Sequence, residues 1–178
     1  MEKAPSVFLR NEIFERDVEC IICWINNPEV TKYLNEDPSL TESLARLLKT
    51  VPAPMLTYNF NRDGRFFVVC LKNGDESSEP VGFVKLKRVT QTEYEIVYAI
   101  GEVCLWGRGY GKRALYSAVN KAFFEMRATN IVARVHPENH RSVRSVRSCG
   151  FVCENDCAAF HRYSLSDAEY LTFLRSKR

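Results

Sequence analysis

The chain contains 178 residues, of which 46% are hydrophobic and 26% are charged. This length and composition fit one globular domain and exclude wholesale disorder. The longest apolar runs, 20–25 and 66–71, are too short to cross a bilayer, and the first residues lack the apolar region of a signal peptide. Seven scattered cysteines without an export signal indicate reduced thiols. We therefore expect a cytoplasmic protein that does not associate with membranes.

The net charge of +3 is distributed unevenly. Residues 101–150 hold nine basic and three acidic side chains, a net charge of +6, so the remainder of the chain carries −3. A basic segment of this kind favours a polyanionic ligand, which is either nucleic acid or a phosphorylated cofactor.

Apolar spacing in the N-terminal third predicts a short strand followed by two helices. The first helix is amphipathic and ends at Asn27-Pro28, and Thr41 is placed to cap the second. The predicted elements are a strand over 7–13, helices over 14–26 and 41–49, and a loop over 55–64.

The rest of the chain predicts a mixed α/β order in one domain, residues 1–178. Three β-rich runs are joined by connections too short for crossovers, so they predict an antiparallel meander. A later strand follows a helix and can pair in parallel with the last meander strand. Gly150 and Ser166 mark a helix end and a helix start. We expect strands over 65–71, 81–89 and 93–100 with a polar turn over 73–80, then a helix over 112–126, a strand over 130–135, a helix over 139–148, strands over 151–154 and 159–165, and a helix to residue 174.

The most informative segment is the glycine turn at 105–112, Leu-Trp-Gly-Arg-Gly-Tyr-Gly-Lys, between a predicted strand and a helix. Glycines at alternate positions allow a sharp bend and leave no Cβ atoms in the way of a ligand. The following helix presents unpaired N–H groups and the positive end of its dipole, with Arg108, Lys112 and Arg113 nearby. The segment predicts an anion site, most plausibly for phosphate, or else a tight connection with no ligand.

Two familiar phosphate-binding motifs fit this turn poorly. A P-loop needs Ser or Thr after Gly111-Lys112, where this chain has Arg113, and a glycine where it has Trp106. The dinucleotide form G-x-G-x-x-A matches residues 109–114, and Glu138 stands where the ribose-binding acid is expected. However, the roughly 40 residues after Glu138 are too few to complete a doubly wound sheet.

The turn and the segment after it resemble the GNAT superfamily of N-acetyltransferases, in which such a loop and helix hold the pyrophosphate of acetyl-CoA. Gly109 and Gly111 match the two small positions of the family loop. Trp106 replaces the polar first residue, as is familiar in the branch of ribosomal-protein-alanine and spermidine acetyltransferases. The same branch has an Asn-x-x-Ser helix that ends in Gly-Phe. Further matches are Asn139, Ser142, Gly150-Phe151, Leu9-Arg10 and residues 24–30.

The resemblance implies a single-domain α/β fold. Its sheet is mixed, mostly antiparallel and flanked by helices, and it splits near residues 100–105 and 131–136 to admit acetyl-CoA. The implied reaction is direct attack of a primary amine on the thioester, the acceptor being a small amine or a protein N-terminus. The strand backbone at 103–105 would supply the oxyanion donor. The implied cofactor-binding residues are Val103, Cys104, Leu105, Arg108, Gly109, Tyr110, Gly111, Lys112, Asn139 and Ser142.

Two residues are the catalytic candidates. Glu95, on a predicted strand with a Glu-Ile-x-Tyr pattern, is the expected base; the alternative is a strand carboxylate paired with Lys85 or Lys87. Tyr98 is the other residue assigned to catalysis; as a base it is, like Tyr163 and His161, a weaker candidate than Glu95, and each of the three is otherwise a packed residue with its polar tip satisfied. The tyrosine that helps the thiolate to leave in many relatives is replaced here by Val146, so the general acid is unassigned.

Other interpretations remain open. A non-catalytic CoA-binding sensor fits the missing tyrosine, and a basic RNA-associated module fits the charge of 101–150, although no aromatic stacking motif supports nucleic-acid binding. The basic residues Arg141, Arg144 and Arg147 share a helix face that is either solvated or paired with the 3′-phosphate of the cofactor. The net acidic N-terminal part mildly favours a cationic acceptor. We expect a monomer or a homodimer.

Metal binding is the remaining alternative. Cys20 and Cys23 have ligand spacing, and Cys149, Cys153 and Cys157 recur every fourth residue. Because Cys20 and Cys23 fall in an amphipathic helix and no paired knuckle exists, the cysteines are interpreted as small core residues rather than zinc ligands.

Overall fold

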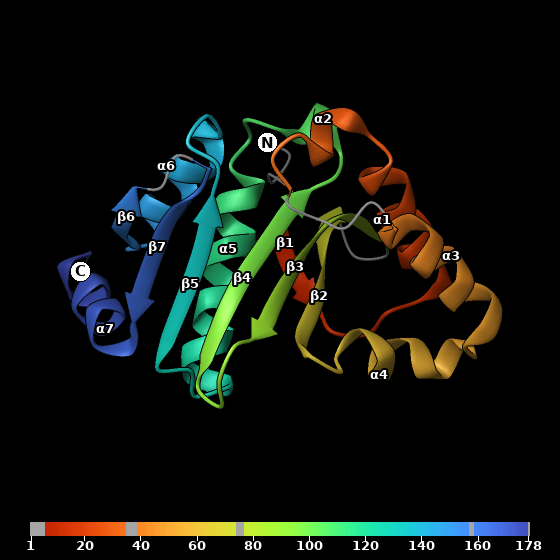
Figure 1. Ribbon diagram of the computed structural model, residues 1–178, viewed down its shortest axis with the longest axis horizontal. Coiled ribbons are helices and arrows are strands. Elements are labelled where there is room, and N and C mark those ends of the chain that lie inside the picture. Colours follow the sequence, from red (N-terminus) through yellow and green to blue (C-terminus); the bar gives the residue numbers. More distant parts are fainter. Residues whose placement is uncertain (1–5, 35–38, 74–76, 157–158, 178) are drawn as a thin grey trace.

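The computed structural model describes residues 6–34, 39–73, 77–156 and 159–177 (Figure 1). One seven-stranded sheet runs in the order β1-β2-β3-β4-β5-β7-β6. β4 and β5 pair in parallel and β2, β3 and β4 pair antiparallel, as the sequence predicted; β1-β2, β5-β7 and β6-β7, for which no pairing was predicted, are antiparallel too. Among the described helices, none is long and apolar enough to span a membrane. The strands are β1 Ser6–Arg10, β2 Gly64–Asn73, β3 Ser77–Arg88, β4 Glu93–Ile100, β5 Asn130–Val135, β6 Val152–Asp156 and β7 His161–Ser166.

Short N-terminal helices cover one face of β2 and β3. They bury a cluster that includes Val18 and Trp24 against Phe66 and Phe83 of the sheet. The predicted loop over 55–64 is wrong there, because a helix holds Leu56, which has no exposed surface, in that cluster. These elements are α1 Glu15–Ile25, α2 Pro28–Thr31, α3 Leu40–Thr50, the 3₁₀ turn η1 Ala53–Met55 and α4 Leu56–Phe60.

Asn27-Pro28 ends α1 as predicted, but it also starts α2. The Asn27 side chain accepts a hydrogen bond from the Glu29 N–H at 3.0 Å, and a proline suits the first position of a helix because its missing N–H is not needed there. This short helix matters because its end leads Tyr33 and Leu34 toward the cavities described below.

The meander is longer than predicted at its first connection. β3 begins at Ser77, so the expected turn over 73–80 is wrong for residues 77–80. These residues pair with Cys70–Asn73 of β2 and so satisfy backbone groups that a turn would leave to solvent. A register shift between Val69 and Cys70 accompanies the extension. At the other edge, β1 is shorter than predicted and ends at Arg10 instead of residue 13.

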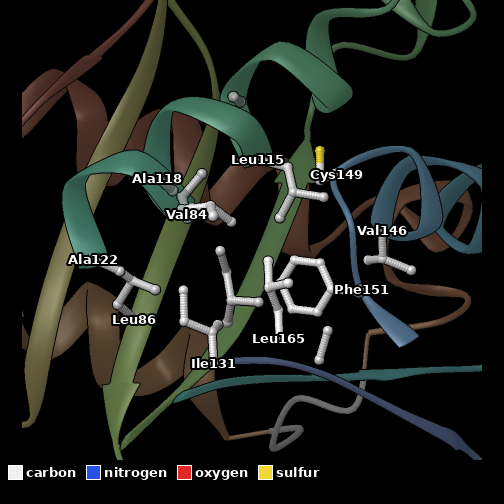
Figure 2. Packing of buried hydrophobic residues seen from close by; sticks show 14 of the residues in the cluster. Val84, Leu86, Leu115, Ala118, Ala122, Ile131, Val146, Cys149, Phe151 and Leu165 are labelled. Carbon is white, nitrogen blue, oxygen red and sulfur yellow. The ribbon is translucent and has the colours of Figure 1, made fainter. Parts of the chain in front are cut away.

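The second core lies on the opposite face, between the sheet and α5, α6 and α7. Figure 2 shows Leu115 and Ala118 of α5 against Val84 and Ile131 of the sheet. The predicted helix over 112–126 is α5 Tyr110–Asn120 followed by a π-helical turn, Lys121–Glu125. The remaining helices agree with prediction: α6 His140–Ser148 ends before Gly150 (φ +98°), and α7 Asp167–Ser176 starts with a Ser166–Glu169 capping box.

The central parallel pair separates along its length. β4 and β5 pair over three residues on each strand, ending at Glu95 and Val132, and their later residues have no partner across the gap. Figure 1 shows the ends of the two strands apart, with α5 visible between them. The split is therefore present, but it opens after Glu95 instead of at 100–105. Residues 101–105 lie outside the sheet.

A buried ion pair fixes the start of α1 to β1. Asp17 is 2% exposed; its carboxylate accepts from the Arg10 guanidinium at 2.7 Å and from the Phe14 N–H at 2.7 Å. Removing one partner of a buried pair leaves an uncompensated charge, which costs about 3–5 kcal/mol. We expect Asp17→Ala to lower the urea unfolding free energy by roughly 3 kcal/mol. Glu154→Ala, which breaks an exposed pair with Arg162, should cost less than about 1 kcal/mol. Equal losses would contradict this account.

Candidate active site

A cavity of about 380 Å³ lies where β4 and β5 separate. Its walls come from the end of β4, the glycine turn, the first turn of α5, the exposed side of α6 and the α2 segment. Seven of the predicted cofactor-binding residues line it: Leu105, Gly109, Tyr110, Gly111, Lys112, Asn139 and Ser142. The glycine turn and the Asn-x-x-Ser segment, about thirty residues apart in the chain, therefore border one space.

The glycine turn leaves its backbone open to this cavity. Gly109 has φ +80°, a left-handed conformation that favours glycine, and a Cβ built there would meet no atom within 4 Å. The first helical bond of α5 runs from the Arg113 N–H to the Gly109 carbonyl at 3.1 Å. The N–H groups of residues 110–112 precede it and have no helical acceptor. Together with the helix dipole, this arrangement can hold a phosphate group.

An arginine and a tryptophan form a cationic wall in the same cavity. The Cζ atom of Arg141 lies 3.9 Å from the ring centroid of Trp106, and both residues line the cavity. The indole N–H of Trp106 donates to the Ile100 carbonyl at 2.7 Å, which fixes the ring. Arg144 also lines the cavity, whereas Arg147 stacks near Tyr163 instead. The basic face of α6 is thus divided: two arginines face the cavity and one does not.

The first turn of α6 contacts a tyrosine hydroxyl from β4 inside the site. Asn139 caps the helix by accepting from the Ser142 N–H at 3.1 Å, and the Ser142 hydroxyl lies 3.1 Å from the Tyr98 hydroxyl. Burial of the hydroxyl raises the pKa of Tyr98 above its ordinary value, while the hydrogen bond to Ser142 acts in the opposite direction. The phenol therefore stays protonated at neutral pH and can donate a proton.

Three predicted cofactor residues are not brought to the cavity. Val103, Cys104 and Arg108 are not among its lining residues, and 103–105 forms a 3₁₀ turn, η2, where a strand was expected. The Leu105 N–H donates to the Glu102 carbonyl at 3.0 Å, so it is already used within the turn. The structure does bring the unpaired edge of β4, at Tyr98, Ala99 and Ile100, to the cavity.

Glu95 lies in a second, adjoining cavity of about 270 Å³. It is paired neither with Lys85 nor with Lys87 in a direct ion pair, as the alternative expected. Instead, both of its oxygens accept from the Arg134 guanidinium of β5 at 2.7 Å. This hydrogen-bonded guanidinium holds the pKa of the Glu95 carboxyl below its ordinary value, although partial burial opposes the shift.

Comparison with known proteins gives the family. The sequence profile described as acetyltransferase (GNAT) domain matches residues 8–152. The chain belongs to the GNAT acetyltransferase family. An uncharacterized N-acetyltransferase p20 from Bacillus licheniformis is 30% identical over 141 residues, which cover 79% of this chain and 75% of that protein. The protein is therefore an N-acetyltransferase of the acyltransferase class, with acetyl-CoA as the cofactor.

Solved structures share the fold. A spermidine N-acetyltransferase from Vibrio cholerae, in complex with CoA and spermine, is 22% identical with a TM-score of 0.73 over 93% of this chain and 98% of that chain. The N-acetyltransferase PseH from Campylobacter jejuni, in complex with acetyl coenzyme A, is 16% identical with a TM-score of 0.62 over 91% and 99%. At these identities the likeness concerns the GNAT fold alone.

One position of this GNAT chain differs from the pattern of many relatives. Val146 stands where they carry the tyrosine that assists the leaving thiolate, and its side chain is fully buried in the core below α6 (Figure 2). A side chain buried there cannot reach the cavity. Ser142, one helical turn earlier, holds the Tyr98 hydroxyl instead. The Tyr98 phenol, which comes from β4, therefore reaches α6 one turn before Val146.

Metal binding finds no support in the described part of the chain, where no group of three or more His, Cys, Asp and Glu side chains could hold an ion. Cys70 and Cys149 are buried, as the interpretation of small core residues requires, but Cys23 is exposed, so that interpretation is wrong for Cys23. Cys157 lies outside the described residues.

Sequence reasoning missed several residues of the site. The ion pair of Glu95 with Arg134 joins two strands whose register is not readable from either segment alone. The stacking of Arg141 on Trp106 was missed because it depends on how α6 packs beside the glycine turn, although the spacing of the arginines had placed Arg141 on a shared helix face. Tyr33 and Leu34, which follow α2, line both cavities; the resemblance had marked residues 24–30 but not these two.

Proposed function

We propose that this protein transfers an acetyl group from acetyl-CoA to a primary amine by direct attack, on a small molecule or a protein N-terminus. One observation carries the proposal: an open glycine turn and a helix N-terminus, an arginine wall and a protonated tyrosine border one cavity at the split of the sheet. The glycine turn with its helix N-terminus and the arginine wall suit a phosphorylated cofactor, and the tyrosine suits acyl transfer.

The residues present fit acetyl-CoA. The backbone N–H groups at 110–112 would hold the pyrophosphate, with Lys112, Arg141 and Arg144 as cationic partners at the same cavity. Asn139 and Ser142 would border the pantetheine arm. When bound, acetyl-CoA supplies an activated thioester whose acetyl carbon an amine can attack. The cavity contains a single carboxylate, Glu29, against these three cations, which favours a polyanionic ligand.

Two groups of the protein serve the transfer. The β4 backbone at residues 98–100, which has no partner on its β5 side, would provide the N–H donor for the developing oxyanion; this replaces the earlier expectation at 103–105. The Tyr98 phenol, kept protonated by burial and held by Ser142, would donate a proton to the departing sulfur. In this assignment Tyr98 fills the role that Val146 cannot.

Glu95 would receive the proton of the attacking amine through water. Because Arg134 binds both carboxylate oxygens, Glu95 is a weak base in the resting pair; it would accept the proton on a lone pair that the guanidinium leaves free, or after one of these hydrogen bonds breaks. Arg134 can turn toward water, since 56% of its side chain is accessible while that of Glu95 is 14% accessible.

The pairing predicts a specific pH dependence. Arg134 lowers the pKa of Glu95, so the wild-type carboxylate stays ionised until the pH falls below its ordinary range. We expect Arg134→Gln to raise that pKa, which moves the acidic limb of the kcat/KM profile to higher pH. Glu95→Gln should remove the limb and lower kcat/KM at neutral pH by about 10²-fold. An Arg134→Gln profile that coincides with that of the wild type would exclude Glu95 as the base.

The divided face of α6 predicts unequal effects of its arginines. Arg141→Gln removes a cation from the cavity, and a hydrogen bond to a charged group is worth about 1.5–3 kcal/mol. We expect the Kd for acetyl-CoA, measured by calorimetry, to rise about ten-fold or more. Arg147→Gln, on the same helix and with the same change of charge, is the matched control and should leave this Kd unchanged. Equal effects would mean that only the overall charge matters.

The reaction itself is tested by mass spectrometry. Purified protein is incubated with acetyl-CoA and a panel of small amines and peptides, and each acceptor is examined for the mass of one acetyl group. We expect acetylation of at least one class of amine, dependent on the enzyme. Tight binding of acetyl-CoA without turnover of any amine would favour the non-catalytic sensor instead.

A further inference from the structure

The second cavity adjoins the first and offers space for the amine acceptor. The two cavities share five lining residues, Tyr33, Leu34, Tyr98, Asn139 and Ser142. If the first cavity holds the cofactor, an amine that reaches Tyr98 from the other side has the rest of its molecule in the second cavity. The side chains of the second cavity should therefore reveal which acceptors it accommodates.

The charge of the second cavity is predominantly positive. Lys85, Lys87 and Arg134 line it together with one carboxylate, Glu95, which Arg134 already neutralises at 2.7 Å. Lys85 and Lys87 are two residues apart on β3 and so point to the same face, opposite Val97 and Glu95 of β4. Neither lysine has an ion pair within the described ranges. Two ammonium groups are thus left to attract an anion.

Aromatic rings form another wall of this cavity. Tyr33 and His136 stack with ring centroids 5.0 Å apart, and Phe160 meets His136 edge-on at 6.0 Å. The Lys32 ammonium lies 5.0 Å from the Tyr33 ring, which adds another cation beside this wall. The wall offers apolar contact to the body of an acceptor, while the lysines on β3 are placed to bind a charged group.

From this arrangement we infer that the acceptor is an amine that also carries an anionic group, a phosphate or a carboxylate, bound by Lys85 and Lys87. The inference rests on the proposed acetyl transfer to an amine. It differs from the expectation of a cationic acceptor, which followed from the net charge of the N-terminal part. A polyamine or a basic peptide would place its ammonium groups beside the two lysines, where like charges repel.

The test compares matched acceptors. Glucosamine 6-phosphate and glucosamine differ by a phosphate, and two short peptides with the same N-terminal residue differ by acidic or basic residues at the next two positions; spermidine represents polyamines. Rates of acetylation give kcat/KM, and calorimetry with the CoA-bound protein gives Kd for the same compounds. We expect the anionic member of at least one pair to have a kcat/KM about ten-fold higher, and a Kd about ten-fold lower, than its partner and spermidine. The pair that responds identifies phosphate or carboxylate as the group bound.

Charge-removal variants locate the effect. Lys85→Gln/Lys87→Gln should abolish the preference by raising KM for the anionic acceptor about ten-fold, while KM for acetyl-CoA stays unchanged. Lys49→Gln/Lys72→Gln removes the same charge from exposed positions on α3 and β2 and should keep the preference. A preference for spermidine or the basic peptide, or one that survives in Lys85→Gln/Lys87→Gln, would overturn the inference.

The two readouts separate this inference from the proposed function. Acetylation of amines without an anionic preference would overturn the inference and leave acetyl transfer intact. Tighter binding of the anionic member to the CoA-bound protein, lost in Lys85→Gln/Lys87→Gln but without acetylation of any compound, would support the charge preference and contradict the proposed reaction.

Discussion

Replacing Gly109 by valine should abolish detectable acetyl-CoA binding while the protein remains folded. Gly109 lines the first cavity directly before α5, and a side chain there would project into space that no protein atom fills within 4 Å. A valine would occupy the path of a phosphate toward the N–H groups at 110–112. The left-handed φ of +80° at position 109 adds backbone strain of about 1–2 kcal/mol to any residue other than glycine, which is too little to unfold a typical domain.

Two measurements separate blocked binding from lost structure. Calorimetry gives the Kd for acetyl-CoA, and thermal unfolding followed by circular dichroism gives the stability of the variant. Gly109→Ala imposes the left-handed strain with only a methyl group, so it should be at least as stable as Gly109→Val, whose β-branched side chain adds strain, and it should retain weakened binding. Wild-type affinity in the valine variant would show that the cofactor does not approach this turn.

Loss of the Tyr98 hydroxyl has the second large expected effect. Tyr98→Phe should lower kcat about 10²-fold, because general acid catalysis typically contributes 10²–10⁴-fold. KM for acetyl-CoA should change little, since the ring still packs between β4 and α6. The measurement is steady-state release of CoA, followed by mass because the protein's own cysteines would interfere with thiol reagents.

Tyr163→Phe is the matched control for this variant. Tyr163 is fully buried, does not line the first cavity, and its hydroxyl has no hydrogen-bond partner in the described structure. Removing that hydroxyl should leave kcat unchanged. A kcat for Tyr98→Phe within two-fold of the wild-type value would refute Tyr98 as the proton donor.

The sequence predicted much of the architecture because most of the information is local. The apolar period of α1 and α5, the Asn139 and Ser166 caps, and the turn glycines each specify their own segment. The short meander connections and the helix before β5 then determine the strand order around the split. The two resemblance motifs bordered one cavity because strand β4 and helix α6 converge on the N-terminus of α5.

The features that the sequence did not predict depend on tertiary contacts. α4 forms because burying Leu56 stabilises residues whose polar sequence otherwise suits a loop. The Glu95–Arg134 pair depends on the register of a parallel pairing only three residues long. The 3₁₀ turn at 103–105 could not be distinguished from a strand continuation, because its apolar residues fit either conformation. Charge averaged over the N-terminal part also gave no information about Lys85 and Lys87 in the second cavity.

The most direct test of the central claim is calorimetric titration of the purified protein with acetyl-CoA, with ATP and NAD as control ligands. We expect one site per chain with a Kd in the micromolar range, about −8 kcal/mol, and no comparable binding of ATP or NAD. Absence of heat with acetyl-CoA, or equal affinity for all three compounds, would contradict the assignment of the first cavity to this cofactor.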